Sequence, residues 1–202
     1  MLKGGANILL NYISKNLLQC LSLMVSFIAL STSIYSIWIN RKKLDVSIEN
    51  SLSDINDIYL NHFDYENNKV AMNLGKGKVC FIKIVNPSPK DISYFDFTVF
   101  NLTTNKRLTY INNALLEGLN MKDTSLFADC NDGLARLNYP NSNYGIFKSN
   151  SFTRLDIAFY PENKTSKIHI LFKVAIPSHS FKRYGFDRRC FKTYHKVFNV
   201  DL

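Results

Sequence analysis

The sequence predicts an all-β protein, an antiparallel β-sandwich preceded by one N-terminal transmembrane helix. Three observations support this fold class. Residues 17–39 are mostly apolar and carry no charged side chain. Short segments in which apolar and polar residues alternate follow through the rest of the chain, and this period is typical of half-buried strands. Turn-forming Asn, Asp, Gly and Pro residues separate these segments, which favours a sandwich over a parallel α/β sheet.

The chain is expected to have three parts, a short tail (residues 1–16), a transmembrane helix (residues 17–40) and a β-sandwich domain (residues 44–202). A helix over the uncharged run is roughly 34 Å long, enough to cross a bilayer core of about 30 Å. Tyr35 and Trp38 fall in its last turns, where aromatic rings prefer the headgroup level. A buried helix would show a polar face, and a signal peptide has a shorter apolar core and small residues at its cleavage site. An uncleaved signal-anchor is therefore the preferred interpretation over these two alternatives.

Basic residues flank the span on both sides. Arg41, Lys42 and Lys43 follow it, whereas Lys3 and Lys15 precede it. Because Lys and Arg near a span tend to stay in the cytoplasm, the tight cluster predicts an outside N-terminus and a cytoplasmic domain. An extracellular domain is the alternative.

The composition of residues 44–202 fits one folded domain. Hydrophobic residues make up 46% and aromatic residues 13% of the whole chain, enough to form a core. Cys80, Cys130 and Cys190 are odd in number and lack the spacing of a zinc site or a disulfide framework, so free thiols in a reducing compartment are expected. The net charge of +9 is uneven, with most of the excess cations in the last forty or so residues of the chain.

The strands are predicted in chain order. Residues 44–48 alternate directly after the span, so the domain is expected to lie close to the membrane. Gly75-Lys76-Gly77 is interpreted as a hairpin turn between strands at 69–74 and 78–85. The clearest alternation predicts a second hairpin of residues 155–159 and 168–176. The remaining predicted elements are strands at 95–99 and 107–111, a short helix at 112–121, an irregular stretch at 122–145 and a closing basic strand at 190–200.

One stretch resembles a known class of proteins. The end of the span through Lys43, the strand that follows it, and the segment from Ile84 to Ser93 (IVNPSPKDIS) are similar to uncharacterised membrane-anchored proteins of low-GC Gram-positive bacteria and their phages. The resemblance covers mainly residues 30–100. It implies an immunoglobulin-like sandwich after a single span, and it implies no known activity.

The basic C-terminal segment, residues 180–198, is the main candidate surface, because its cations alternate with aromatic side chains. Three interpretations are open: a solvated edge strand whose charges oppose aggregation, attraction to anionic lipid, and nucleic-acid binding, which membrane tethering makes unlikely. The candidate membrane or anionic-surface residues are Arg41, Lys42, Lys43, Lys182, Arg183, Arg188, Arg189, Lys192 and Lys196, with Tyr35 and Trp38 as interfacial aromatics.

No catalytic, cofactor-binding or metal site is expected. His62 lies near Asp54, Asp57 and Asp64 in the sequence, but solvated loops produce the same pattern. His169 falls on the polar face of a predicted strand and is expected to be an ordinary surface residue. The sequence thus predicts a non-enzymatic interaction module with a protein partner and a possible anionic-lipid contact. The alternatives are an exported cell-surface domain in phage exclusion or adhesion and, more weakly, a hydrolase that uses His62.

Overall fold

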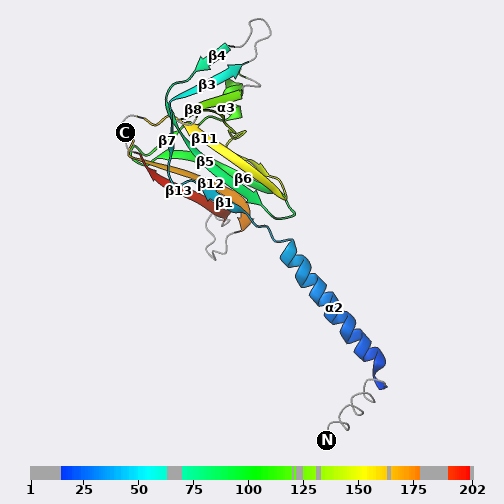
Figure 1. Cartoon of the computed structure of the whole chain (residues 1–202). Helices are drawn as coiled ribbons and strands as arrows, with labels where there is room; N and C mark the ends of the chain where they lie inside the picture. Colours follow the sequence, from blue (N-terminus) through cyan, green and yellow to red (C-terminus); the bar gives the residue numbers. More distant parts are fainter. Residues whose placement is uncertain are drawn as a thin grey trace. The chain divides into compact units, whose positions relative to one another are not determined.

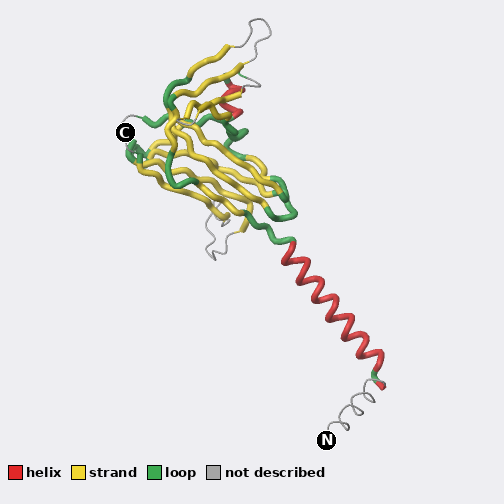
Figure 2. The backbone as a smooth tube through the Cα atoms, viewed as in Figure 1, coloured by secondary structure: helices red, strands yellow, loops and turns green. Residues whose placement is uncertain are grey.

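The computed structural model describes residues 15–62, 70–119, 121, 125–130, 133–162, 165–177 and 191–200. The chain divides into two compact units, Met1–Arg41 and Lys42–Leu202. The described part of the first unit is a helix, and the second unit contains all of the described strands (Figures 1 and 2).

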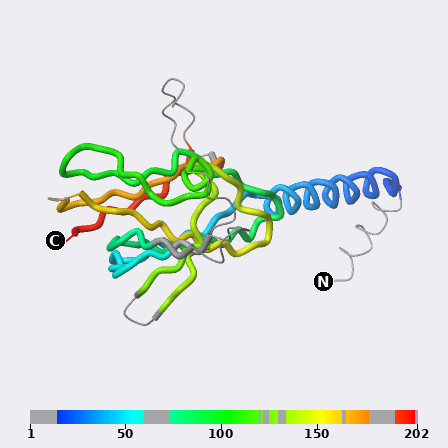
Figure 3. The backbone as a smooth tube through the Cα atoms, turned by 90° about the horizontal axis from the view of Figure 1, so that it is seen from above, coloured from blue at the N-terminus to red at the C-terminus, as the bar shows by residue number. Residues whose placement is uncertain are grey.

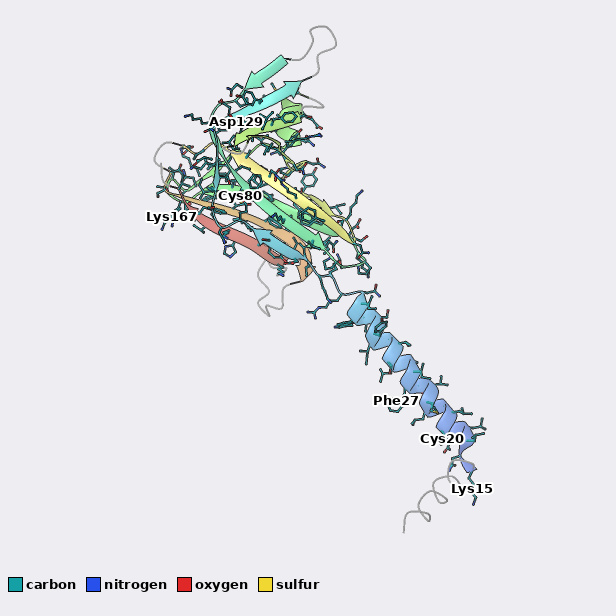
Figure 4. The ribbon with its side chains drawn as sticks, in the orientation of Figure 1. Lys15, Cys20, Phe27, Cys80, Asp129 and Lys167 are labelled. Atoms are coloured by element: carbon teal, nitrogen blue, oxygen red, sulfur yellow. The ribbon has the colours of Figure 1, made fainter. Side chains whose placement is uncertain are left out.

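The helix of the first unit, α2 (Leu17–Ile39), has 23 residues, and none of them is buried. The helix is long enough and apolar enough to cross a membrane. The hydroxyl groups of Ser26, Thr32 and Ser33 donate to backbone carbonyls of the preceding turn at 2.8–3.0 Å. These bonds leave few polar groups unpaired along the helix, which suits an apolar medium. In Figure 4 the side chains of α2, Cys20 and Phe27 among them, radiate from the helix into open space.

The described strands of the second unit form three antiparallel sheets. The central sheet contains β1 (Asp45–Ile48), β2 (Ser53–Ile55), β5 (Gly77–Asn86) and β11 (Ser151–Phe159), with β5 in the middle. The facing sheet contains β6 (Ile92–Asn101), β7 (Lys106–Leu108), β10 (Gly145–Phe147), β12 (Lys167–Pro177) and β13 (Phe191–Asn199). The small sheet contains β3 (Asp57–His62), β4 (Val70–Asn73), β8 (Ser125–Cys130) and β9 (Gly133–Arg136).

The main hydrophobic core lies between the central sheet and the facing sheet. Alternate residues of the long strands point into it, including Ile82 and Ile84 of β5 and Ile170 of β12. The Phe172 ring stacks on the Phe97 ring, with centroids 5.4 Å apart and planes 8° apart. Burial of these side chains, worth about 1.5–3 kcal/mol each, makes this core the main source of stability.

A second, smaller core lies on the other face of the central sheet. Ile58, Leu126 and Ala128 of the small sheet pack there against Val79 of β5 and Ala158 of β11. The short helix α3 (Asn113–Gly118) contributes Leu116, and the side chain of Asn112 accepts the Leu115 N–H at its N-terminus (2.8 Å). Figure 3 shows β11 between the small sheet on one side and the strands of the facing sheet on the other.

The predicted β-sandwich with an N-terminal apolar helix is confirmed, but both predicted hairpins are wrong. Strand β4 pairs with β3 and not with β5, and Gly75 (φ +82°) turns the chain from one sheet into another. Likewise β11 pairs with β5, whereas β12 pairs with β6 and β13. Alternation shows that one face of a strand is buried, but it does not show which strand lies beside it.

The second discrepancy is the small sheet, which the sequence did not predict. The stretch at 122–145, expected to be irregular, contains β8, β9 and the start of β10. Its strands are short, and the stretch as a whole is rich in Asn, Asp and Gly, residues that are depleted in strands. They form because burial of Leu126 and Ala128 in the second core outweighs the low strand propensity of their neighbours.

Candidate functional site

The chain enters the domain after Lys43, at the start of β1. Several other strands begin or end beside this point, and we call this end of the domain the entry end. Its turns are residues 86–92, which join β5 to β6, and residues 147–151, which join β10 to β11. Strand β12 finishes and β13 starts at this end as well. The registers that define the entry end are Asp45 opposite Val85, Asn86 opposite Ser151, Phe147 opposite Ile92, and Pro177 opposite Phe191.

The side chain of Asn86 fixes both turns of the entry end. It is fully buried, and its amide group donates to the carbonyls of Lys90, Phe147 and Lys148 at 2.9–3.0 Å. Its Oδ1 accepts the Ser88 N–H (3.1 Å) and the Ser88 hydroxyl (2.5 Å). All donors and acceptors of this buried amide are therefore used. The Asn-Pro-Ser element behind the sequence resemblance thus has a structural role.

At the entry end no described residue packs over the outer face of the central sheet, which carries an exposed apolar pair there. Val85 of β5 and Phe152 of β11 lie directly opposite each other, with 41% and 62% of their surfaces exposed. The next outward pair along the same strands is Lys83 and Arg154. The Arg154 guanidinium lies 4.9 Å from the centre of the Phe81 ring, and its Nε donates to Asp156 at 2.7 Å. The apolar pair Val85 and Phe152 is therefore followed, two residues further along each strand, by the basic pair Lys83 and Arg154.

More cations lie at the entry end. Exposed or half-buried lysines occupy its turns and strand starts, whereas its described carboxylates are few. One of these carboxylates, Asp91, accepts the Ser149 N–H at 2.7 Å and so belongs to the turn. The entry end is thus apolar at one place and positively charged around it. Its further described lysines are Lys42, Lys43, Lys90, Lys148 and Lys192.

The described cations of the basic C-terminal segment differ in their surroundings. The Lys196 ammonium donates to the Ile48 carbonyl (3.2 Å) and to Asn50 Oδ1 (2.6 Å). The Tyr194 hydroxyl donates to the Leu44 carbonyl at 2.9 Å. Together these bonds join β13 to β1 and close one edge of the sandwich. Lys192 is exposed, with its ammonium 4.6 Å from the centre of the Tyr194 ring.

The other predicted site residues lie in α2, shortly after it, or outside the described residues. Tyr35 and Trp38 are exposed in the last turns of α2. Arg41, Lys42 and Lys43 follow directly. Lys182, Arg183, Arg188 and Arg189 lie outside the described residues. Their predicted contact with an anionic surface stays a prediction.

The residues of the weaker hydrolase alternative are partly described. Asp54 pairs with the Lys78 ammonium at 2.6 Å, and Asp57 accepts from Asn73 Nδ2 (3.0 Å) and the Tyr59 hydroxyl (3.3 Å). The charge of Asp57 is the main cause that raises the pKa of Tyr59. The His62 side chain and Asp64 lie outside the described part. Within the described residues no group of three or more His, Cys, Asp or Glu side chains could hold a metal ion.

The sequence also gave no sign of an open cleft beside a bulge in β6. The register between β6 and β12 shifts near Asp96, whose φ of 54° is left-handed, and the Phe97 N–H donates to the Asn143 carbonyl instead. The cleft is about 350 Å³ in volume and is lined largely by polar side chains, Arg107 and Asn112 among them. Lys173 pairs with Asp96 at 3.0 Å. This arrangement explains the bend of β6 but assigns no ligand.

Comparison with known proteins identifies no family. No family model matches the sequence, and no curated protein matches it either. Two solved structures match: the yjhA protein of Bacillus subtilis (TM-score 0.39, 8% identity, 80% of this chain and 94% of that one) and ycdA, a candidate lipoprotein of Bacillus subtilis (TM-score 0.30, 8% identity, 80% of this chain and 38% of that one). At these scores neither likeness assigns a function.

Proposed function

We propose that this chain is a membrane-anchored, non-enzymatic interaction protein whose entry end contacts the anionic lipid surface beside its own anchor. The observation that carries the proposal is the exposed pair Val85 and Phe152, backed by Lys83 and Arg154. An exposed apolar pair with a basic surround fits an interface between hydrocarbon and charged headgroups. The rest of the domain surface is then free to bind a protein partner.

The two pairs have the spacing that such a contact requires. Outward residues two positions apart in a strand are separated by roughly 7 Å. Amphipathic elements bury their apolar side chains about 5–10 Å into the boundary between headgroups and acyl chains. When Phe152 enters this layer, Lys83 and Arg154 lie at the level of the phosphates. Each basic residue near an anionic surface contributes about 1 kcal/mol.

The covalent connection supports the same contact. Residues 40–44 separate the end of α2 from the start of β1. A fully extended chain of this length reaches roughly 20 Å, so a lipid surface around the anchor is within reach of the entry end. Arg41, Lys42 and Lys43 place the domain on the cytoplasmic side in this proposal. The lipid contact itself requires only that the bilayer surface be anionic.

The test uses the full chain in lipid nanodiscs. Trp38 is the only tryptophan of the chain, so a Trp38→Phe background with Phe152→Trp provides a single fluorescent reporter at the entry end. We expect brominated acyl chains to quench this reporter in discs of phosphatidylglycerol and phosphatidylcholine, and much less in neutral discs. Leu134→Trp, at an exposed position of β9 in the small sheet, is the matched control that should not be quenched.

Charge substitutions separate lipid attraction from simple proximity. Lys83→Glu combined with Lys148→Glu should abolish the quenching, and so should about 1 M salt, where the Debye length is about 3 Å. Lys106→Glu removes an exposed lysine at the opposite end of the facing sheet and should leave the quenching unchanged. Equal quenching in neutral and anionic discs, or in the presence and absence of salt, would overturn the proposed contact.

A further inference from the structure

Two histidines meet on the outer face of the facing sheet. His169 of β12 lies opposite Val197, and His195 of β13 lies opposite Leu171. The two histidines are therefore diagonal neighbours on adjacent antiparallel strands, and their side chains point to the same side. Their ring centroids are 5.3 Å apart, with the ring planes at 86°.

The two imidazoles differ in exposure. His195 is exposed on the edge strand, whereas His169 is half-buried and its Nε2 is fully buried. That nitrogen has no hydrogen-bond partner among the described residues. Leaving a buried polar nitrogen unpaired is costly, and an imidazole nitrogen is a common metal ligand.

The separation of the rings matches the geometry of a shared metal ion. An imidazole nitrogen lies about 2.0–2.1 Å from a bound Zn²⁺, and the ring centre lies about 1 Å further away. Two imidazoles on one tetrahedral ion therefore have ring centres about 5 Å apart. The observed 5.3 Å agrees with this value, and the exposed His195 ring can turn without disturbing the core.

We propose that His169 and His195 together bind one divalent transition-metal ion, such as Zn²⁺ or Co²⁺. Imidazole is a preferred ligand for these ions, and water fills the remaining coordination positions. Within the described residues no third His, Cys, Asp or Glu joins the pair. Because β13 is the edge strand of the facing sheet, the bound ion would join this edge to β12.

The test is a titration of the full chain in detergent with Co²⁺, whose visible absorption reports its ligands. We expect saturation at one ion per chain, with d–d bands of nitrogen and oxygen ligation and without a thiolate charge-transfer band. His195→Ala, which changes only an exposed side chain, should weaken binding at least about tenfold, because loss of even an outer-shell partner costs that much. His169→Ala should do the same.

His62→Ala is the matched control, because it removes a histidine from a different sheet and should leave the Co²⁺ affinity unchanged. Zn²⁺ should compete with Co²⁺ and raise the melting temperature of the unaltered chain but not that of His195→Ala, since a ligand stabilises only the state that binds it. Unchanged Co²⁺ binding in His195→Ala, or a thiolate charge-transfer band, would assign the ion to another part of the chain and overturn the proposal.

Discussion

The outer face of the central sheet has two halves that share the strands β5 and β11 but have opposite surroundings. In the half beside the small sheet, Val79 and Ala158 are fully buried in the second core. In the half at the entry end, Val85 and Phe152 are exposed. Both halves follow the same alternation along the same strands. An apolar outward residue in a strand therefore does not by itself show whether another part of the chain covers it.

The boundary between the two halves lies at Asp156. Its carboxylate is fully buried, accepts the Asn138 N–H at 2.8 Å, and pairs with the Arg154 Nε at 2.7 Å. A buried carboxylate needs such partners, and here one is a backbone group and the other a cation on the uncovered side. The outward residues of β11 thus change within a few positions from exposed aromatic and cation to buried acid and small buried side chain.

The largest effect is expected when the same charge is placed in each half. Ala158→Asp puts an unpaired carboxylate into the second core, and we expect it to lower the free energy of unfolding by at least about 3 kcal/mol. Phe152→Asp puts the carboxylate on the uncovered half, where we expect a change within about 1 kcal/mol. Chemical denaturation of the two full-length variants in detergent, followed by circular dichroism, measures both.

Ala158→Ser serves as the control, because it keeps the size of the side chain small without adding charge. In nanodiscs Phe152→Asp should nevertheless move the domain away from anionic lipid. If the two Asp variants lost the same amount of stability, the halves would not differ in cover and the comparison would fail.

The sequence predicted which faces of the strands are buried, but it did not predict which strands pair. The uncharged run predicted the apolar helix α2, and the alternation in β5, β6 and β12 predicted strands with one buried face, so the helix and the sandwich were predictable. Strand partners were not, because the turn at residues 160–166 resembles a hairpin connection but takes the chain from β11 in the central sheet to β12 in the facing sheet. Partner choice depends on packing between residues distant in the chain, which a local pattern does not contain.

The candidate site was less predictable than the fold. The basic segment from residue 180 onward stood out in the sequence, yet its member Lys196 bonds to Ile48 and Asn50 and closes the sandwich edge. Phe152 gave no signal, because a single outward aromatic residue looks the same as an inward one. His169 was expected to be an ordinary surface residue, and its contact with His195 depends on the register between β12 and β13.

The next largest change in stability is expected at Asn86, whose side chain holds the two turns beside the uncovered half. Asn86→Ala removes hydrogen bonds to three carbonyls and to Ser88, and we expect a loss of roughly 2–3 kcal/mol of unfolding free energy. Ser88→Ala removes only the hydroxyl contacts and should cost about 1 kcal/mol. Denaturant midpoints of the two variants in detergent give the difference. A loss below about 0.5 kcal/mol for Asn86→Ala would show that the two turns of the entry end are stable without it.

The smallest expected effect is one of accessibility, with stability unchanged. Cys80 and Val85 lie on the same strand, but Cys80 points into the main core and is fully buried (labelled in Figure 4). Burial raises the pKa of the Cys80 thiol to about 12, so the reactive thiolate is absent at neutral pH. In a background with the other cysteines changed to Ser, we expect Cys80 to react with maleimide only after denaturation, whereas Val85→Cys reacts at once in detergent.

The same variant then tests what covers the uncovered half. In anionic nanodiscs the labelling of Val85→Cys by a water-soluble maleimide should slow, because lipid headgroups occupy the surface around it. Leu134→Cys, exposed on the small sheet, should react equally fast in detergent and in nanodiscs. Slower labelling at both positions would indicate a general effect of the disc. Unchanged labelling at both positions would show that lipid does not cover the apolar pair and would favour a protein partner. Slowing at Val85→Cys alone would mean that the bilayer covers the part of the central sheet that the small sheet does not.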